Sequence, residues 1–384
     1  MTLDSELSEE LAEWRRGGLT RSLRALKESS GVHVLLDGRP VLSLGSNNYL
    51  GLANHPEVRA AAVACIERVG LGSGGARLTT GNYPEHGALE RELADWQGTE
   101  DAMLFESGYA ANIGVIPALL GRGDLILSDS LNHASLIDGC RLSRAEVRVY
   151  GHRDVETAAA LLNDRAAFRR CAIVTDGVFS MDGDLAPLPE LCTLAERQGA
   201  FLIVDDAHGG GVLGPEGAGT ISLPGVDGRV AVRIGTMSKA LGASGGFAAG
   251  SRALCEYLRH RARSFVYSTA PPPAVAAGAL AALRLTRQGD ALREKLHDNA
   301  EWLRSVFRLH GWTVPDGQTA IIPVMVGDAA AAVLASERLL AAGVLVPAIR
   351  PPTVPRGSAR LRVTASAALT IADRIWIEKA LNQL

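Results

Sequence analysis

Short apolar runs alternate with helical patterns through most of this chain, and no other feature constrains its fold as strongly. Strands that alternate with amphipathic helices form a mostly parallel sheet with helices on both faces. In such sheets ligands bind outside the carboxyl ends of the strands, so the residues after each run are the first candidates for a site. The runs that we interpret as strands are residues 101–105, 125–128, 147–150, 172–175, 201–205, 230–235 and 246–249.

The chain has 384 residues, which is long enough for two packed units. We predict an N-terminal arm over residues 1–48, in which Asp37 and Gly38 make the tight turn of a hairpin. Residues 49–284 are predicted to form the large α/β domain, and residues 285–384 a smaller α+β domain.

Charge and cysteine usage argue against several classes of protein. A formal net charge of -3 provides no basic surface for nucleic acid. The longest apolar stretch, residues 274–283, is too short to span a membrane, and the acidic N-terminus does not resemble a secretory signal. The five cysteines include no C-x-x-C pair, which disfavours zinc sites and disulfides. We therefore expect a cytoplasmic protein that binds no metal, membrane or nucleic acid.

Asp205 and Lys239 each follow a predicted strand, and together they indicate a cofactor. Asp205 ends an apolar run, so its partly buried carboxylate needs a cationic partner. Lys239 lies among small residues that would let a flat ring approach the backbone. Pyridoxal phosphate (PLP) needs an amine for its aldehyde and an anion against its pyridine nitrogen. The alternatives are a solvated lysine and an aspartate that caps a turn, as we expect for Asp206.

Other polar residues after the predicted strands suit the same cofactor. The segment 107–112 opens a helix after a strand, and a helix N-terminus binds anions such as a phosphate. Thr236 offers a hydroxyl to that phosphate, and His208 could donate to the phenolic oxygen of the cofactor. The alternatives are an ordinary N-cap serine at the helix and a loop histidine bonded to the backbone.

Three further positions are candidates for contacts with the ring or the substrate. His133 could lie flat against the pyridine ring, or it could be a packed structural histidine. Ser180 lies in a polar turn and either contacts the cofactor or shapes the turn. The alternating segment 359–364 puts Arg360 and Arg362 on one face, where a guanidinium could bind a carboxylate in bidentate fashion. A solvated edge strand would show the same pattern.

Three other sequence patterns match known binding or catalytic motifs, but the residues around them do not fit those motifs. Asp205, Asp206 and His208 could be metal ligands, but the glycines that follow leave no further ligand nearby. Residues 209–214 match the dinucleotide fingerprint G-x-G-x-x-G at every position, yet no helix is expected after them. Residues 242–246 match G-x-S-x-G, but a strand-like run follows this segment instead of preceding it.

With these residues in place, the chain resembles the α-oxoamine synthase family of fold-type I PLP-dependent transferases over nearly its whole length. The shared strings are residues 46–52, 72–75, 179–184, 204–209 and 348–355. The resemblance implies catalytic roles for Lys239, which binds the cofactor aldehyde, for Asp205 at the pyridine nitrogen and for His133 on the ring. It also implies cofactor contacts from Gly108, Tyr109, Ser180, His208 and Thr236, and substrate contacts from Arg21, Asn47, His133, Thr353 and Arg362.

The family activity implied by this resemblance is a decarboxylative condensation of an amino acid with an acyl thioester. The string 348–355 is similar to one branch of the family, which implies L-alanine and a pimeloyl thioester, on coenzyme A or on an acyl carrier protein, in biotin biosynthesis. Glycine-using members that make 2-amino-3-oxobutyrate or 5-aminolevulinate are the first alternative. A catalytically inactive relative that acts as a binding subunit is the second.

The resemblance further implies a homodimer with the active site at the subunit boundary. Residues 268–269 resemble the segment that reaches the phosphate site of the neighbouring subunit. Two positions depart from the family pattern: Gly210 stands where threonine or serine is common, and Leu369 where histidine is common.

Overall fold

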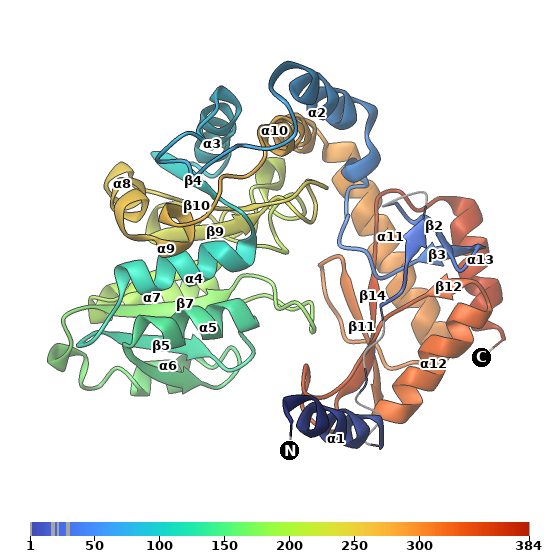
Figure 1. Cartoon of the computed structure of the whole chain (residues 1–384). Helices are drawn as coiled ribbons and strands as arrows, with labels where there is room; N and C mark the ends of the chain where they lie inside the picture. The colour runs from blue at the N-terminus through green and yellow to red at the C-terminus, as the bar shows by residue number, and fades with distance from the viewer. Residues whose placement is uncertain (1, 17–19, 21–22, 28–30, 384) are drawn as a thin grey trace.

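Seven strands form one sheet on the left-hand side of Figure 1, in the computed structural model, which describes residues 2–16, 20, 23–27 and 31–383. All seven predicted strands are confirmed, with ends that differ by at most two residues. Their order across the sheet is β4-β10-β9-β8-β7-β5-β6. Their bounds are β4 Asp101–Phe105, β5 Leu125–Asp129, β6 Glu146–Tyr150, β7 Cys171–Asp176, β8 Phe201–Asp205, β9 Val232–Thr236 and β10 Gly246–Gly250.

The sheet is mostly parallel, as predicted. Strands β6, β5, β7, β8 and β9 run parallel to one another, and only β10 is antiparallel to its two neighbours. None of the helices in the described part of the chain is long and apolar enough to cross a membrane. The helices of this unit are α2 Pro56–Val69, α3 Pro84–Trp96, α4 Gly108–Leu119, α5 Ala134–Ser143, α6 Val155–Ala160, α7 Leu188–Gln198, α8 Arg252–Arg261, α9 Arg263–Val266 and α10 Pro273–Arg287.

Alternate residues along the central strands pack against different helices, because successive side chains of a strand point to opposite faces. Ile126 belongs to the core on the side of α4 and α5. Leu125 and Leu127, its neighbours on β5, belong to the core on the side of α6 and α7. Helices therefore cover both faces of the sheet, which explains why the central strands are apolar throughout.

The C-terminal unit is built on a second, smaller sheet. Its elements are α11 Asp290–Leu309, β11 Ile321–Gly327, α12 Ala329–Ala341, β12 Val344–Leu345, β13 Ala348–Ile349, β14 Ala359–Thr364 and α13 Ile371–Leu381. The strand order is β11-β14-β13, and all six residues of β14 are buried. The alternative of a solvated edge strand at residues 359–364 is therefore wrong, because β14 has a partner on each side.

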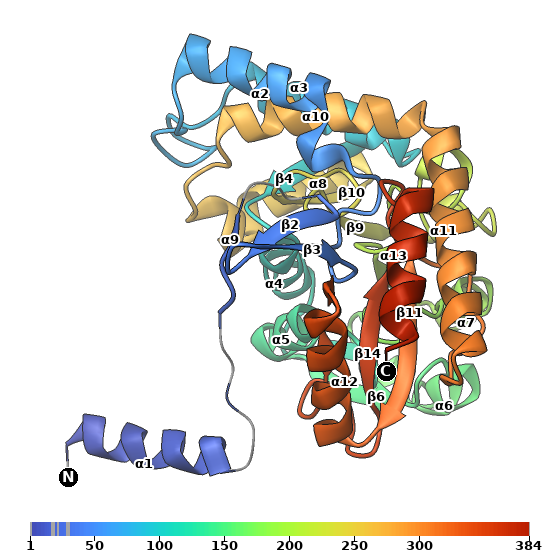
Figure 2. The ribbon, with the colours of Figure 1, turned by 90° about the vertical axis from the view of Figure 1, so that its right-hand side faces the viewer.

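The N-terminal arm forms the predicted hairpin. Strands β2 (His33–Leu36) and β3 (Arg39–Ser43) are antiparallel, and Asp37 and Gly38 between them both have positive φ, which is typical of a type I′ turn. Strand β12 pairs in parallel with β3, so the arm and the C-terminal unit share a sheet. Figure 2 shows α1 (Leu3–Arg16), which has no buried residue, standing apart from the other elements. The division at residues 48 and 284 stays a prediction.

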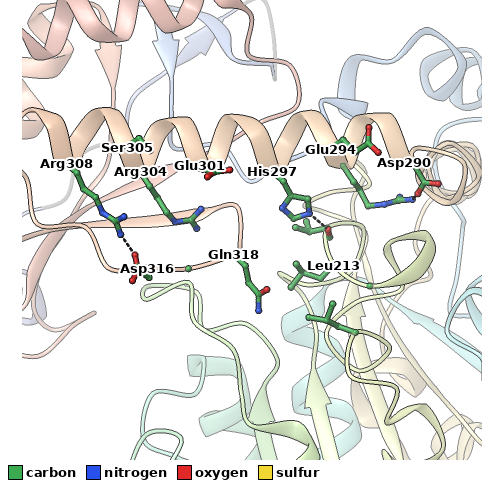
Figure 3. A pocket seen from close by; sticks show the side chains of 15 residues that line it. Leu213, Asp290, Glu294, His297, Glu301, Arg304, Ser305, Arg308, Asp316 and Gln318 are labelled. Carbon is green, nitrogen blue, oxygen red and sulfur yellow. Dashed lines mark hydrogen bonds and ion pairs between the residues drawn. The ribbon is translucent and has the colours of Figure 1, made fainter.

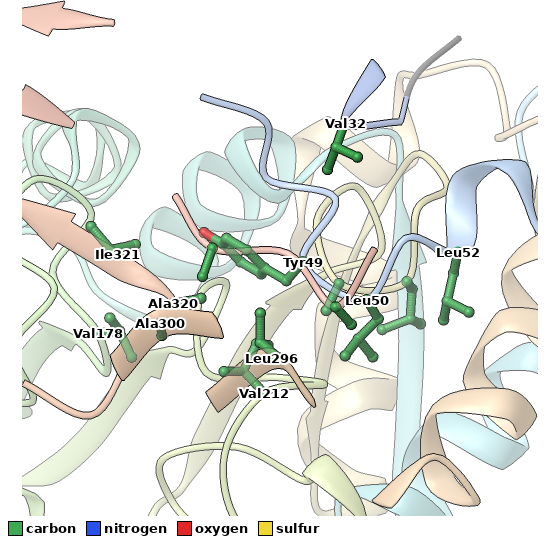
Figure 4. Packing of buried hydrophobic residues seen from close by; sticks show 14 of the residues in the cluster. Val32, Tyr49, Leu50, Leu52, Val178, Val212, Leu296, Ala300, Ala320 and Ile321 are labelled. Atoms are coloured by element: carbon green, nitrogen blue, oxygen red, sulfur yellow. The ribbon is translucent and has the colours of Figure 1, made fainter. Parts of the chain in front are cut away.

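One hydrophobic core joins the central sheet to the C-terminal unit. It includes Leu104 of β4, Leu296 of α11 and Val363 of β14. Tyr49 is fully buried in the same core, and Figure 4 shows its ring close to Ala320. The segment that follows β3 is thereby held between the two units.

The turn after β8 is shaped by a buried carboxylate. Asp206 accepts hydrogen bonds from the backbone N–H of Thr220 at 2.7 Å and from its hydroxyl at 2.7 Å, and burial raises the pKa of Asp206 to about 7. Gly219 has φ +108°, and a Cβ there would stand 1.9 Å from Asp206 Oδ2. Asp206 therefore has the structural role predicted for it, and a short 3-10 turn, Pro215–Gly217, follows where a dinucleotide site would need a long helix.

We predict that Gly219→Ala destabilises the protein much more than Gly225→Ala. Both glycines have positive φ, but a Cβ on Gly225 meets nothing within 4 Å. Gly225→Ala should lower the free energy of unfolding by about 1 kcal/mol through backbone strain, and Gly219→Ala by about 3 kcal/mol because a clash is added. Urea denaturation of the two variants measures the difference, and equal losses would contradict the close approach to Asp206.

Candidate active site

The carboxyl edge of the central sheet brings the predicted residues together. Asp176 at the end of β7 and Asp205 at the end of β8 are partners in the strand register. Gly246 pairs with Phe105 on one side and with Thr236 on the other, so the segments after β4 and β9 begin side by side. Residues distant in the sequence therefore meet at one edge, as expected of an α/β sheet.

Lys239 lies in the turn after β9, with its amine against a histidine. Its Nζ atom is 2.8 Å from Nε2 of His208. Burial lowers the pKa of Lys239 to about 8, although the negative charge of Asp205 acts in the opposite direction. A larger fraction of this amine is therefore neutral near pH 7 than for an ordinary lysine, and only a neutral amine can attack an aldehyde or accept a proton.

His208 connects Lys239 to residues of the N-terminal segment. Burial and then the charge of Lys239 lower the pKa of His208 well below its usual value, so the ring is neutral. Its Nδ1 atom is 2.6 Å from the hydroxyl of Tyr49, which in turn lies 3.2 Å from Oδ1 of Asn47. Sequence reasoning missed Tyr49, because a buried aromatic residue reads as core and nothing in the string 46–52 shows the partner of its hydroxyl.

Asp205 is a buried carboxylate with only neutral hydrogen-bond donors. Its side chain is 5% exposed, and it accepts from Nδ2 of Asn112 at 2.6 Å and from the backbone N–H of Ala207 at 3.0 Å. Such a carboxylate is suited to a cationic partner such as a pyridinium. Asn112 was also missed, because it lies inside α4 and no sequence pattern marks it.

His133 is held at the same edge by its backbone and by its ring. The backbone N–H donates to Oδ2 of Asp176 at 2.6 Å. The ring Nδ1 accepts from the backbone N–H of Ser135 at 3.2 Å and lies 2.7 Å from its hydroxyl, so we infer that the proton is on Nε2. Asn112 donates to the same hydroxyl at 2.8 Å and thus links Asp205 to His133. The residue remains exposed, which leaves the ring accessible.

The N-terminus of α4 and the turn after β9 form a cradle for an anion. The Ser107 hydroxyl caps α4 by accepting from Ala110, and the N–H groups of Gly108 and Tyr109 precede this bonded position and can serve a ligand. The Thr236 and Ser238 hydroxyls lie 2.6 Å apart. A Cβ on Gly246 would stand 2.4 Å from the carbonyl oxygen of Ser107, so only glycine allows β10 to approach this helix end.

The two predicted residues of this cradle differ in how they can serve it. A Cβ on Gly108 would stand 3.4 Å from Cβ of Thr236, which puts the start of α4 directly beside the β9 turn. The Tyr109 side chain is exposed, and its hydroxyl donates to Oδ2 of Asp138 at 2.6 Å. Tyr109 would therefore contribute its backbone N–H.

Arg362 contacts residues predicted for the site, while Arg360 does not. Arg362 donates from Nη1 to Oδ1 of Asn47 at 3.1 Å and from Nε to the carbonyl oxygen of Ser180 at 2.6 Å. Arg360 pairs with Asp182 instead. The structure therefore joins three predicted residues, Asn47, Ser180 and Arg362, and separates the two arginines that the sequence pattern could not distinguish.

Two predicted substrate residues are not joined to this group. Thr353 is exposed and lines a cleft of about 890 Å³ with Arg24, Ser46 and Pro347 among others. The backbone N–H of Thr353 donates to the carbonyl oxygen of Arg350 at 3.1 Å, and not to the residues above. Arg21 lies outside the described residues.

Another cleft, of about 740 Å³, runs along α11 and contains none of the predicted site residues (Figure 3). Two of its arginines are paired with carboxylates: Arg293 with Asp290, and Arg308 with Asp316 at 2.7 Å. His297 lies 3.2 Å from the carbonyl oxygen of Val212. These pairings give no reason to assign chemistry to this cleft.

The carboxylates at the carboxyl edge of the sheet are not grouped as metal ligands in the described part of the chain. Over residues 2–16, 20, 23–27 and 31–383, no group of three or more His, Cys, Asp or Glu side chains is arranged to hold an ion. The carboxylates of Asp205 and Asp206 are taken up by Asn112 and Thr220.

The chemistry of these donors fits PLP. An amine of lowered pKa, a buried carboxylate and an anion cradle all lie at one sheet edge, as the aldehyde, the pyridine nitrogen and the phosphate of PLP require.

Comparison with known proteins agrees with this geometry. The family model for aminotransferase class I and II matches residues 39–375. The chain is 50% identical over 363 residues to the 8-amino-7-oxononanoate synthase of Trichlorobacter lovleyi, covering 94% of this chain and 93% of that protein. Serine palmitoyltransferase from S. paucimobilis with bound PLP and myriocin has a TM-score of 0.93 and 31% identity, over 99% of this chain and 98% of its own.

An 8-amino-7-oxononanoate synthase structure from Francisella tularensis has a TM-score of 0.76 and 27% identity, covering 89% of this chain and 96% of that one. The chain therefore belongs to the aminotransferase class I and II family, as a fold-type I PLP-dependent transferase. Within it, the chain groups with the 8-amino-7-oxononanoate synthases. The predicted fold class and cofactor are confirmed.

We predict that Lys239 of the cofactor-free protein reacts with amine reagents with a half-maximal rate near pH 8, because burial lowers its pKa. Reductive methylation followed by peptide mass spectrometry measures the rate, and the three other lysines, Lys27, Lys295 and Lys379, serve as internal references. Asp205→Asn should move the midpoint of Lys239 further down, because the variant lacks the anion that stabilises the ammonium. A wild-type midpoint near 10.4, the value of an unperturbed lysine, would contradict this environment.

Proposed function

We propose that this protein condenses L-alanine with a pimeloyl thioester to give 8-amino-7-oxononanoate and CO2, in biotin biosynthesis. The observation that carries the proposal is the arrangement of Lys239, Asp205 and the Arg362–Asn47 pair at one sheet edge. The 50% identity to a curated synthase over 94% of the chain supports the choice of reaction.

The contacts at the carboxyl edge of the sheet support the proposed cofactor-binding roles. PLP, when bound, supplies an electron-poor ring that takes up the electron pair released at the Cα atom of an amino acid. Lys239 would hold the aldehyde carbon, and the Asp205 carboxylate would keep the pyridine nitrogen protonated. His133 would lie against the ring, His208 would donate to the phenolic oxygen, and Ser180 would contact the cofactor. Gly108, Tyr109 and Thr236 would hold the phosphate.

Arg362 and Asn47 bind the carboxylate of the amino acid. Oδ1 of Asn47 accepts from Arg362 at 3.1 Å and from Tyr49 at 3.2 Å, so the Nδ2 group of Asn47 remains a donor for a carboxylate. The Arg362 guanidinium is fixed by Ser180 on another edge and adds a positive charge to the same place. Thr353 and Arg21 are proposed for the acyl donor, on the side of the cleft of about 890 Å³.

Proton transfers are assigned to Lys239 and His133. The amine of Lys239, freed when the amine of alanine takes its place, removes the Cα proton of alanine. A carbon–carbon bond then forms between Cα and the thioester carbonyl carbon, and the carbon–sulfur bond breaks as the thiol leaves with that proton. His133 donates a hydrogen bond from Nε2 to the new ketone oxygen while CO2 departs, and Cα then takes up a proton from solvent by way of Lys239.

We also propose a homodimer with residues 268–269 at the phosphate site of the neighbouring subunit. Thr269 is exposed and free to contact another chain, and Tyr267 beside it is 73% exposed. The five cysteines are free, buried thiols, which suits a reducing compartment such as the cytoplasm.

The assay that tests the function measures CO2 release from alanine or glycine paired with pimeloyl-, acetyl- or succinyl-CoA. We expect the highest rate from alanine with the pimeloyl thioester. Lys239→Ala should lower the rate at least about a thousandfold, because the variant lacks the base and the cofactor link. Lys295→Ala, a change on an exposed face of α11, is the control. A higher rate with glycine than with alanine would contradict the proposed substrate. Turnover retained in Lys239→Ala would contradict the proposed chemistry.

We predict that Arg362→Lys raises the KM for alanine about 10- to 100-fold and leaves the KM for the acyl donor unchanged. Lysine keeps the charge but lacks the planar fork that binds a carboxylate at two points. Arg360→Lys is the matched control, because Arg360 lies on the same strand but pairs with Asp182. Steady-state kinetics of both variants test the assignment, which is wrong if they raise the KM for alanine equally.

A further inference from the structure

A continuous chain of hydrogen bonds connects the amine of Lys239 to the proposed carboxylate site. Lys239 Nζ lies 2.8 Å from Nε2 of His208, and Nδ1 of His208 lies 2.6 Å from the Tyr49 hydroxyl. The hydroxyl lies 3.2 Å from Oδ1 of Asn47, which also accepts from Arg362. The proposed function assigns roles to every member of this chain except Tyr49.

The number of protons limits how this chain can be arranged. A neutral His208 has one ring N–H, so one of its nitrogens donates and the other accepts. Oδ1 of Asn47 can only accept, whereas the Tyr49 hydroxyl can donate once and also accept. Burial raises the pKa of Tyr49, so its hydroxyl keeps its proton.

Two arrangements satisfy these limits, and the charge of Lys239 decides whether both are available. When Lys239 is an ammonium it has only donors, so Nε2 of His208 accepts, Nδ1–H donates to Tyr49, and Tyr49 donates to Asn47. When Lys239 is neutral it can donate or accept, so a second arrangement becomes available, in which Tyr49 donates to Nδ1 and Nε2–H of His208 donates to the amine. The 2.6 Å contact between Tyr49 and His208 is a hydrogen bond in both arrangements, with its donor reversed, and only the first arrangement keeps the 3.2 Å bond from Tyr49 to Asn47.

We propose that Tyr49 is a positioning residue that sets the tautomer of His208 and thereby controls when Lys239 holds a proton. The Nε2–H tautomer is also the one that His208 needs to donate to an acceptor such as the phenolic oxygen of PLP. Tyr49 thus acts on the amine and on the cofactor site without touching either.

The packing around Tyr49 supports this role. Its ring is fully buried among Val178, Val212 and Ile321 (Figure 4), so the hydroxyl is fixed by the core. The ring centroids of Tyr49 and His208 are 6.1 Å apart at an interplanar angle of 49°, which brings the hydroxyl to the histidine edge. A phenylalanine would keep this packing and remove only the hydroxyl.

Several charged or titratable groups surround this chain of hydrogen bonds, and they contribute to the pKa of Lys239 that the tests measure. The charges of Asp205 and Asp176 raise the pKa of Lys239, while Arg362 lowers it. These groups act on Lys239 in wild type and variant alike. The full set around Lys239 and His208 is Asp176, Asp205, Asp206, His133 and Arg362.

The first test uses the wild-type protein without cofactor. Nitrogen-15 NMR of histidine distinguishes the two tautomers, and His208→Gln identifies the resonances of His208. We expect only the Nδ1–H form of His208 below the midpoint of Lys239 in the methylation experiment, and any Nε2–H form only above that midpoint. An Nε2–H form below the midpoint would overturn the proposal.

The second test compares Tyr49→Phe with Tyr150→Phe in the methylation experiment. Without the Tyr49 hydroxyl, an ammonium at residue 239 forces a buried Nδ1–H without an acceptor, so the pKa of Lys239 should fall by about one unit. Tyr150 is also buried and lies on β6, so Tyr150→Phe should leave the pKa unchanged. An unchanged pKa in Tyr49→Phe, or an equal shift in both variants, would refute the control by Tyr49.

The role of Tyr49 during turnover rests on the proposed function, but both tests are made without cofactor or substrate. A failed CO2-release assay together with the expected Nδ1–H form would reject the reaction and leave the hydrogen-bond chain intact. The expected CO2 release together with an Nε2–H form below the midpoint would reject the role of Tyr49 and leave the reaction intact. In the loaded enzyme, Tyr49→Phe should also shift the pH profile of kcat, which a loss of packing alone does not do.

Discussion

The amine of Lys239 is held beside two carboxylates at the carboxyl edge of the sheet, and the rest of the site depends on this placement. The parallel register aligns Asp176 with Asp205, and the turn after β9 brings Lys239 to the same edge. Burial favours the neutral amine while the carboxylates favour the ammonium, and the balance gives a pKa of about 8. Such an amine exchanges protons near physiological pH, which neither a solvated lysine nor a fully desolvated one does.

The neighbours of Lys239 are fixed by different parts of the chain, so the site depends on the whole fold. Tyr49 follows the N-terminal hairpin, His208 the strand β8, and Arg362 lies on β14 of the C-terminal unit. The shared core around Tyr49 holds these segments in register. The hydrogen bonds from Lys239 to Arg362 therefore join the two units chemically as well as by packing. A change in how the units meet would alter both the amine and the carboxylate site.

The strands of the large sheet and the polar residues at its carboxyl edge could be predicted from the sequence, because buried strands are apolar and polar residues after them are rare. The positions of Asp205 and Lys239 are predicted in this way. Asn112 and Tyr49 could not be found, since their polar atoms matter only through residues far away in the chain. The pattern at residues 359–364 predicted a strand but not its central position, because the alternation of side chains contains no information about neighbouring strands.

The central claim is that the amine of residue 239 holds the aldehyde of PLP. The most direct measurement is to incubate the purified protein with PLP, reduce it with borohydride and locate the pyridoxyl group by peptide mass spectrometry. The account predicts the added mass on the peptide that contains Lys239 and none on peptides with Lys27, Lys295 or Lys379. An unmodified Lys239, or an equal label on all four lysines, would contradict it.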